Sequence, residues 1–161
     1  MSNKKEIGLA IIGCGTIGRI RAMMAKDYPG ISWIGLCDIN EELGKKLLND
    51  CEADFFTTDY NDLVKRSEVN AVIIATDENH HFGPIMASLE NESSLFIEKP
   101  LATDLVESRD VLNKIKSTNV DAVLGYTQRF RRRFLAVKQK LMDQKIGHVT
   151  SVVTRAFMNS M

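Results

Sequence analysis

The sequence predicts an α/β fold in which helices cover both faces of a doubly wound parallel sheet. Short apolar runs alternate along the chain with longer amphipathic stretches. The runs are continuously apolar, as in Val72-Ile73-Ile74, which is typical of strands buried on both faces. Strands and helices that alternate in this way form right-handed crossover units.

The first half of the chain reads as three strand–helix units. An apolar run over 7–12 predicts a strand, and a helix follows over 17–26. After a turn at Tyr28-Pro29-Gly30, residues 31–37 form the second strand and residues 41–49 the second helix. Residues 54–57 read as a short strand, and Asp59 is expected to cap a helix over 59–64.

The second half begins with the clearest strand, a β-branched run over 69–75. A helix over 81–89 follows it, with Asn79 as a candidate N-cap. Strands over 94–98 and 121–125 flank a long helix over 104–116. A helix over 130–143 and a more mixed strand over 149–157 complete the pattern.

The last strand breaks the rhythm, because no helix follows it. We interpret residues 127–161 as the first helix and strand of a largely missing second α/β domain, after a first domain over 1–126. With no sheet to join, this strand would leave an unpaired edge, which predicts self-association.

Composition excludes several classes of protein. The 161 residues are 44% hydrophobic and 26% charged, as in an ordinary globular protein. Twenty-one basic and twenty-one acidic residues cancel, so neither nucleic acid nor a membrane is an expected partner. Three cysteines without CxxC spacing indicate no disulfide framework and no metal site, which fits a cytoplasmic protein.

A glycine loop follows the first strand and opens the first helix. Gly13 permits a tight turn, Gly15 lets the backbone approach a pyrophosphate, and Gly18 allows close packing of helix on strand. Free N–H groups at the start of the helix would meet the anion. The alternative is that these glycines only shape a strand–helix turn.

Asp38 stands at the end of the second strand, where it would accept hydrogen bonds from an adenosine ribose. A 2′-phosphate there would face a carboxylate, and two like charges about 4 Å apart repel by roughly 4 kcal/mol at an effective dielectric of 20. Ile39 and Asn40 follow, with no arginine to neutralise a phosphate. The sequence therefore favours NAD over NADP.

Two further stretches accompany the glycine loop in order. Thr76 follows the fourth strand, His81 comes five residues later, and Glu98-Lys99-Pro100 ends the next strand. With Gly125-Tyr126-Thr127-Gln128-Arg129-Phe130 and Ile146-Gly147-His148-Val149, the chain resembles the glucose–fructose oxidoreductase/inositol dehydrogenase family (Gfo/Idh/MocA) over essentially its whole length.

The resemblance implies a Rossmann fold and a catalytic role for Lys99 beside the nicotinamide. An ammonium there would hydrogen-bond the substrate hydroxyl, stabilise charge that develops on its oxygen, and share in proton transfer. Pro100 extends the backbone of Lys99, and in this family that peptide is often cis. The alternative is a solvated lysine at the end of a strand.

The resemblance also suggests where the cofactor lies. Thr76 and His81 would bracket a loop near the ribose and nicotinamide, although the usual threonine-proline-asparagine is altered by Asp77 and Glu78. For His81, cofactor contact and helix capping stay open. The expected cofactor-binding residues are Gly13, Gly15, Thr16, Ile17, Gly18, Asp38, Ile39, Thr76, Asn79, His81, Glu98, Lys99 and Gln128.

The family implies an NAD(P)-dependent dehydrogenase of a sugar, inositol or related polyol that forms homo-oligomers. Its acid–base aspartate and histidine would lie beyond Met161, so this chain alone is expected to be inactive. Alternatives are a non-catalytic NAD-binding module and a nucleic-acid binder using the basic run at residues 129–133. For that run we prefer a solvated helix start with Phe130 and Phe134 buried.

Overall fold

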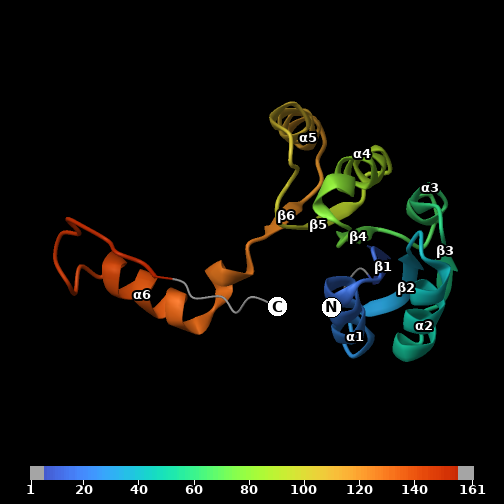
Figure 1. Ribbon diagram of the computed structural model, residues 1–161, viewed down its shortest axis with the longest axis horizontal. Helices are drawn as coiled ribbons and strands as arrows, with labels where there is room; N and C mark the ends of the chain where they lie inside the picture. Colours follow the sequence, from blue (N-terminus) through green and yellow to red (C-terminus); the bar gives the residue numbers. More distant parts are fainter. Residues whose placement is uncertain (1–5, 156–161) are drawn as a thin grey trace, which may run out of the picture. The chain divides into compact units, whose positions relative to one another are not determined.

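The computed structural model describes residues 6–155, which divide into two compact units between Gly125 and Tyr126. The first unit holds a six-stranded, all-parallel sheet in the order β3-β2-β1-β4-β5-β6 (Figure 1). This is the Rossmann order, so the predicted doubly wound fold is confirmed. The strands are β1 (Ile7–Ile12), β2 (Ile31–Cys37), β3 (Phe55–Thr57), β4 (Ala71–Ile74), β5 (Ser94–Glu98) and β6 (Ala122–Gly125).

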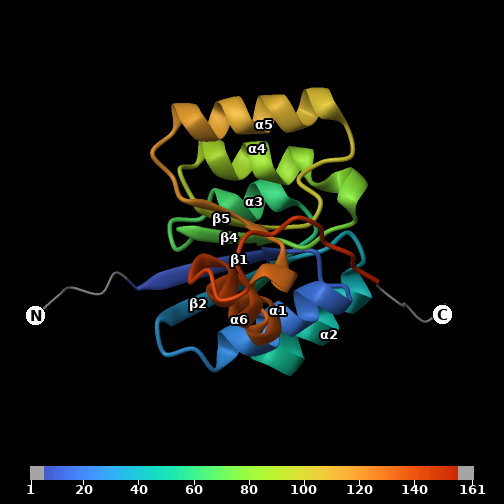
Figure 2. The same cartoon turned by 90° about the vertical axis from the view of Figure 1, so that its left-hand side faces the viewer.

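Helices cover both faces of this sheet. Figure 2 shows α1 and α2 on one side and α3, α4 and α5 on the other. Within residues 6–155 no helix combines the length and the apolarity that crossing a membrane requires. The helices are α1 (Thr16–Lys26), α2 (Glu41–Cys51), α3 (Tyr60–Val64), α4 (Phe82–Glu90) and α5 (Leu105–Ser117), and a 3₁₀ turn, η1 (Glu78–His80), precedes α4.

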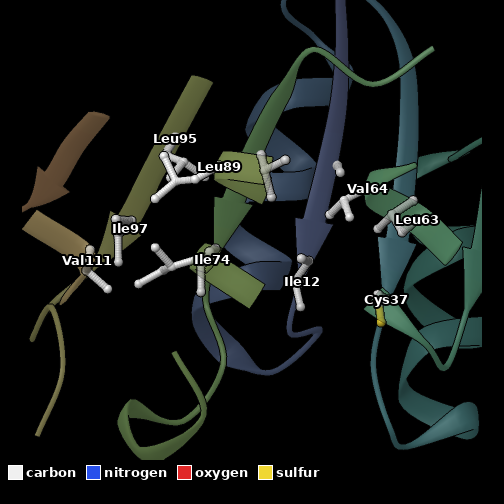
Figure 3. Close-up of a cluster of buried hydrophobic side chains, with 12 residues drawn as sticks. Ile12, Cys37, Leu63, Val64, Ile74, Leu89, Leu95, Ile97 and Val111 are labelled. Atoms are coloured by element: carbon white, nitrogen blue, oxygen red, sulfur yellow. The ribbon is translucent and has the colours of Figure 1, made fainter. Parts of the chain in front are cut away.

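Each face of the sheet has its own hydrophobic core. Ile11 and Ile12 are neighbours in β1, and each belongs to the core on a different face. Successive side chains of such a strand pack into the cores on opposite faces of the sheet, so every position must be apolar. This explains the continuous apolar runs in the sequence. Figure 3 shows the core beneath α3, α4 and α5, where strand residues Ile12, Ile74 and Ile97 share a cluster with helix residues Leu63, Leu89 and Val111.

Side-chain caps fix the starts of α2, α3 and α5. Asn40, Asp59 and Asp104 each accept backbone N–H groups of the first turn at 2.7–3.1 Å. The predicted cap at Asp59 is confirmed. Such caps satisfy N–H groups that have no partner within the helix.

The predicted cap at Asn79 is wrong. Asp77 takes this role instead: its Oδ1 accepts the backbone N–H of Asn79 at 3.1 Å and starts η1. The Asn79 side-chain amide also donates to Asp77 Oδ1 at 2.8 Å, so the asparagine side chain is held by the residue that caps the turn. As a result, α4 begins only at Phe82.

The second unit contains a 3₁₀ turn, η2 (Thr127–Phe130), and α6 (Arg132–Met142). The expectation that Phe130 and Phe134 are buried is wrong, since they are 65% and 47% exposed. The reason is that this unit builds no core within residues 126–155, where every residue is exposed.

The predicted strand over 149–157 is not formed by its described part. Residues 149–155 have no strand assignment, and residues 156–157 lie outside the described residues. A strand needs ladder hydrogen bonds to a neighbouring strand, and the described chain supplies none to this segment. Self-association through this segment stays a prediction.

Candidate cofactor site

The carboxyl ends of β1, β4 and β5 lie side by side at one edge of the sheet. The loops that leave them carry Gly13, Thr76 and Lys99. β1 is also where the strand order changes direction, because β2 and β4 flank it. Open α/β sheets bind their ligands at such a switch point.

The glycines of the first loop meet three different demands. Gly13 has φ +97°, and a Cβ there would lie 2.6 Å from the Ala75 carbonyl group. A Cβ on Gly18 would lie 1.8 Å from the Gly13 oxygen, so α1 packs on the loop only without a side chain. Gly15 has nothing within 4 Å, which leaves open space above the loop for a ligand.

The N-terminus of α1 has no side-chain cap and no acidic residue in its first turn. The backbone N–H groups of Thr16, Ile17 and Gly18 belong to this turn, where a helix has no internal partners for them. The helix dipole places partial positive charge at the same point. The arrangement suits a diphosphate.

Asp38 follows β2 and holds the glycine loop. Its Oδ2 accepts the Cys14 N–H at 2.6 Å, and its Oδ1 accepts the Asn40 N–H at 2.8 Å. A carboxylate offers about four acceptor positions, so each oxygen keeps one for a ligand hydroxyl. Asp38 can therefore bind a ribose diol while it fixes the loop.

A cavity of about 600 Å³ opens beside this loop. Three acids, Asp38, Asp77 and Glu107, line it, and among the described lining residues none is lysine or arginine. An anionic ligand would thus be bound by backbone N–H groups rather than by side-chain cations. Of the expected cofactor residues, the lining includes Gly13, Gly15, Asp38, Ile39, Thr76 and Asn79.

Thr76 brings an unsatisfied hydroxyl to this cavity. Its Oγ1 is buried and has no hydrogen-bond partner in the described chain. A buried polar atom without a partner costs free energy, which a polar ligand atom in the cavity would recover. This hydroxyl, the open space over Gly15 and the free acceptors of Asp38 together fit a dinucleotide.

Glu98 and Lys99 lie outside the cavity lining. Glu98 Oε1 accepts from Arg21 Nε at 3.0 Å and from Nη2 at 2.5 Å, and the guanidinium lies 4.8 Å from the centre of the Phe96 ring. Glu98 thus ties α1 to the end of β5. Lys99 follows β5 directly, is exposed, and precedes Pro100 through a cis peptide.

Of the two roles expected for His81, helix capping is wrong, and contact with the cofactor stays a prediction. The ring is 1% exposed and is not among the residues that line the cavity. It makes no capping hydrogen bond to α4. Both ring nitrogens instead lie against backbone carbonyls: Nδ1 is 2.8 Å from Pro100 O and Nε2 is 3.3 Å from Thr76 O.

A comparison with family models identifies this arrangement. The model GFO_IDH_MocA, described as an oxidoreductase family with an NAD-binding Rossmann fold, matches residues 7–126. The chain belongs to the Gfo/Idh/MocA family. The resemblance inferred from the sequence is confirmed, and the glycine loop and Asp38 lie within the NAD-binding region of the family.

Relatives of this Gfo/Idh/MocA chain include two inositol dehydrogenases. It is 25% identical over 149 residues to myo-inositol 2-dehydrogenase of Thermotoga maritima, covering 91% of the chain and 45% of the relative. It is 25% identical over 143 residues to scyllo-inositol 2-dehydrogenase (NAD(+)) of Bacillus subtilis, covering 88% and 42%. The chain therefore spans less than half the length of these relatives.

A solved family structure shares the fold. It is scyllo-inositol dehydrogenase from Lactobacillus casei with bound NAD(H) and scyllo-inositol, with a TM-score of 0.85 and 24% identity. The match covers 91% of this chain and 44% of that one. At this identity the likeness establishes the fold of the chain.

Sequence reasoning missed part of the cavity wall. Thr58 directly follows β3. Ligands of open α/β sheets bind at the carboxyl ends of the strands, and this rule, which indicates Asp38 after β2, would also have indicated Thr58. Glu107 comes from the first turn of α5 and has no local signal. Gln128 lies in η2 of the second unit and stays a predicted cofactor contact. The other lining residues that were not among the expected cofactor contacts are Ile12, Cys37, Tyr60, Ala75, Asp77, His80, Phe82, Gly83 and Pro84.

The cysteines near the site are inert thiols. Burial, and then the charge of Asp38, raise the pKa of Cys14 and of Cys37 to about 12. The Cys14 thiol lies 3.7 Å from the Cys37 carbonyl oxygen, to which it donates. Because the thiolate is the reactive form, neither residue is a nucleophile at neutral pH.

Proposed function

We propose that this chain supplies the dinucleotide-binding part of an NAD-dependent dehydrogenase that acts on a sugar, inositol or related polyol. The observation that carries the proposal is the uncapped start of α1 beside a carboxylate with free acceptor positions. Membership of an NAD-binding oxidoreductase family and the inositol dehydrogenases among its relatives support it.

The proposed contacts follow the cavity from one end to the other. Asp38 accepts the adenosine ribose hydroxyls, with the exposed Ile39 beside the adenine. The first-turn N–H groups of α1 bind the pyrophosphate over Gly15. Thr76 and Asn79 lie toward the nicotinamide ribose, where the free Thr76 hydroxyl finds a partner.

We propose NAD rather than NADP for an electrostatic reason. Asp38 would face a 2′-phosphate with no cation of the described cavity wall to offset it. The repulsion is roughly 4 kcal/mol for charges about 4 Å apart at an effective dielectric of 20. Asp77 and Glu107 add negative charge to the same cavity.

When bound, NAD would supply the hydride acceptor for oxidation of an alcohol: the electron pair of the C–H bond would pass to the nicotinamide and the hydroxyl proton to a general base or water, which leaves a carbonyl. In this proposal Lys99 donates a hydrogen bond to that oxygen and stabilises the charge that develops on it. A homo-oligomer follows from the family resemblance. The three free, buried cysteines support a cytoplasmic location.

Titration with NAD and NADP tests the cofactor half of the proposal. We expect NAD to raise the thermal midpoint of the chain, since cofactor at 100 times its Kd adds about 2.7 kcal/mol of stability. NADP should produce a smaller shift at the same concentration. If neither dinucleotide moves the midpoint, the proposal is wrong.

The variant Asp38→Asn tests the choice between the two cofactors. Removing the charge should weaken the binding of NAD. It should also reduce the ratio of the affinities for NAD and NADP by about tenfold or more, because the repulsion of the 2′-phosphate disappears. Glu90→Gln, which neutralises an exposed acid outside the cavity, is the matched control. Unchanged discrimination in Asp38→Asn would remove the electrostatic argument.

A further inference from the structure

His81 joins two loops that are separate in the sequence. One loop leaves β4 and carries Thr76, and the other leaves β5 and carries Lys99 and Pro100. The buried imidazole lies between them, with Nδ1 2.8 Å from Pro100 O and Nε2 3.3 Å from Thr76 O. A second link joins the same loops, since the Thr103 hydroxyl donates to Asn79 Oδ1 at 3.4 Å.

The chemistry of the two partners decides which nitrogen carries the proton. Both partners are backbone carbonyls, which only accept hydrogen bonds, whereas a neutral imidazole has a single N–H. The shorter contact has the geometry of a good hydrogen bond, and the longer one is at the weak limit. A ring with one N–H therefore makes its better hydrogen bond with the proton on Nδ1, directed at Pro100.

The contact with Pro100 bears directly on Lys99. The Pro100 carbonyl belongs to the Pro100–Leu101 peptide, one residue beyond the lysine, so fixing its plane restrains the turn from which Lys99 projects. The other side of the ring lies against the carbonyl of Thr76, a residue that lines the cofactor cavity. One side chain thus spans from the cavity wall to the lysine turn.

We infer that His81 is a positioning residue, which sets the Lys99 turn relative to Thr76 through its Nδ1–H bond to Pro100. The inference rests on the proposed function for the roles of Lys99 and Thr76. It assigns His81 no contact with cofactor or substrate, in keeping with its burial.

Two substitutions in the full chain separate the two ring contacts. In His81→Asn, the amide nitrogen can occupy the place of Nδ1 and donate to Pro100. In His81→Gln, the amide reaches only the place of Nε2. Both variants remove the same ring and differ by one methylene, and they differ in which carbonyl the amide can reach: Pro100 in His81→Asn and Thr76 in His81→Gln.

Two readouts go beyond stability. Long-range ¹H–¹⁵N correlation of the imidazole should show the Nδ1–H tautomer in the wild type. The amide resonance of Leu101, which shares the peptide with the Pro100 carbonyl, should keep its position in His81→Asn and move in His81→Gln. NAD should bind His81→Asn within about threefold of the wild type and His81→Gln about tenfold more weakly, as for the loss of one buried hydrogen bond.

A proton on Nε2, or equal Leu101 shifts in the two variants, would overturn the inference. So would equal NAD affinities in two variants that remain folded. If the wild type fails to bind NAD while the tautomer and the Leu101 shifts are as expected, the proposed function fails and the linkage of the loops stands. The two claims are therefore distinguishable.

Discussion

The glycine loop shows how one motif makes different demands at neighbouring residues. Gly18 has no room for a side chain because α1 rests on the Gly13 carbonyl, whereas Gly15 faces open space. The glycine at position 18 is needed for the packing of the fold, and the glycine at position 15 leaves space for a ligand. A substitution at each position should therefore affect different properties.

Alanine at these two positions should separate folding from binding. We expect Gly18→Ala to lower the free energy of unfolding by about 1–3 kcal/mol, because the methyl group is forced against backbone. Gly15→Ala should cost less than about 1 kcal/mol, as at an ordinary N-cap, but should weaken NAD binding. Urea denaturation without cofactor and NAD titration measure the two effects. Equal loss of stability in both variants would contradict this division.

The buried thiols predict a dependence of stability on high pH. Their folded pKa of about 12 lies above the ordinary value of 9.0, so the stability they contribute is present below pH 9 and is lost as the pH rises toward 12. The urea concentration at the unfolding midpoint should decrease as the pH is raised from 8 to 10.5. At pH 8 a disulfide reagent should label Cys14 and Cys37 only as fast as the chain unfolds, and rapid labelling of the folded chain would argue against buried thiols.

At the scale of elements, the ends of helices divide into two kinds. α2, α3 and α5 begin at side-chain caps, which fix each helix start within the chain itself. α1, α4 and α6 begin without one, and among these only α1 starts at the glycine loop beside the cavity, where its first-turn N–H groups are left for a ligand. In α5 the cap also places Glu107, one of the three acids of the cavity wall.

Removing the cap of α5 should destabilise the first unit. Asp104→Ala loses the acceptor for Val106 and Glu107 N–H groups, which costs about 1 kcal/mol. Asp104→Ser keeps an acceptor and should retain most of the stability. Chemical denaturation of both variants checks this, and identical losses would mean that the cap contributes nothing.

At the scale of the whole molecule, burial is concentrated in one unit. Every buried core residue lies before Gly125, while residues 126–155 are exposed throughout. Local opening is easiest where few apolar contacts hold the backbone. The two units should therefore differ in their resistance to proteolysis.

Limited digestion with trypsin should cleave first in the second unit. The run of arginines over 129–133 is exposed, so we expect a resistant fragment that ends near Arg129. Mass spectrometry of the early products locates the cut. First cleavage within α1–α5, at equal digestion times, would show that the sheet unit is the less stable of the two.

Local sequence patterns alone predict the sheet, its helices, and the glycine loop with Asp38. These features follow from local periodicity and from the spacing of a turn, a helix start and an acid, which the order of residues records directly. The prediction of a strand is wrong over its described part, residues 149–155, and so is the prediction that Phe130 and Phe134 are buried. Strand pairing and burial need partners that a local pattern does not reveal.

The position of His81 and the residues of the cavity wall are visible only in the folded chain. The imidazole reaches Pro100, nineteen residues away in the chain, and Glu107 arrives from the start of α5. Contacts of this kind arise when parallel strands bring their carboxyl ends to one edge, so that loops distant in sequence become neighbours. The types of residue indicate the class of ligand, but the packing of the sheet determines which of these residues lie close together.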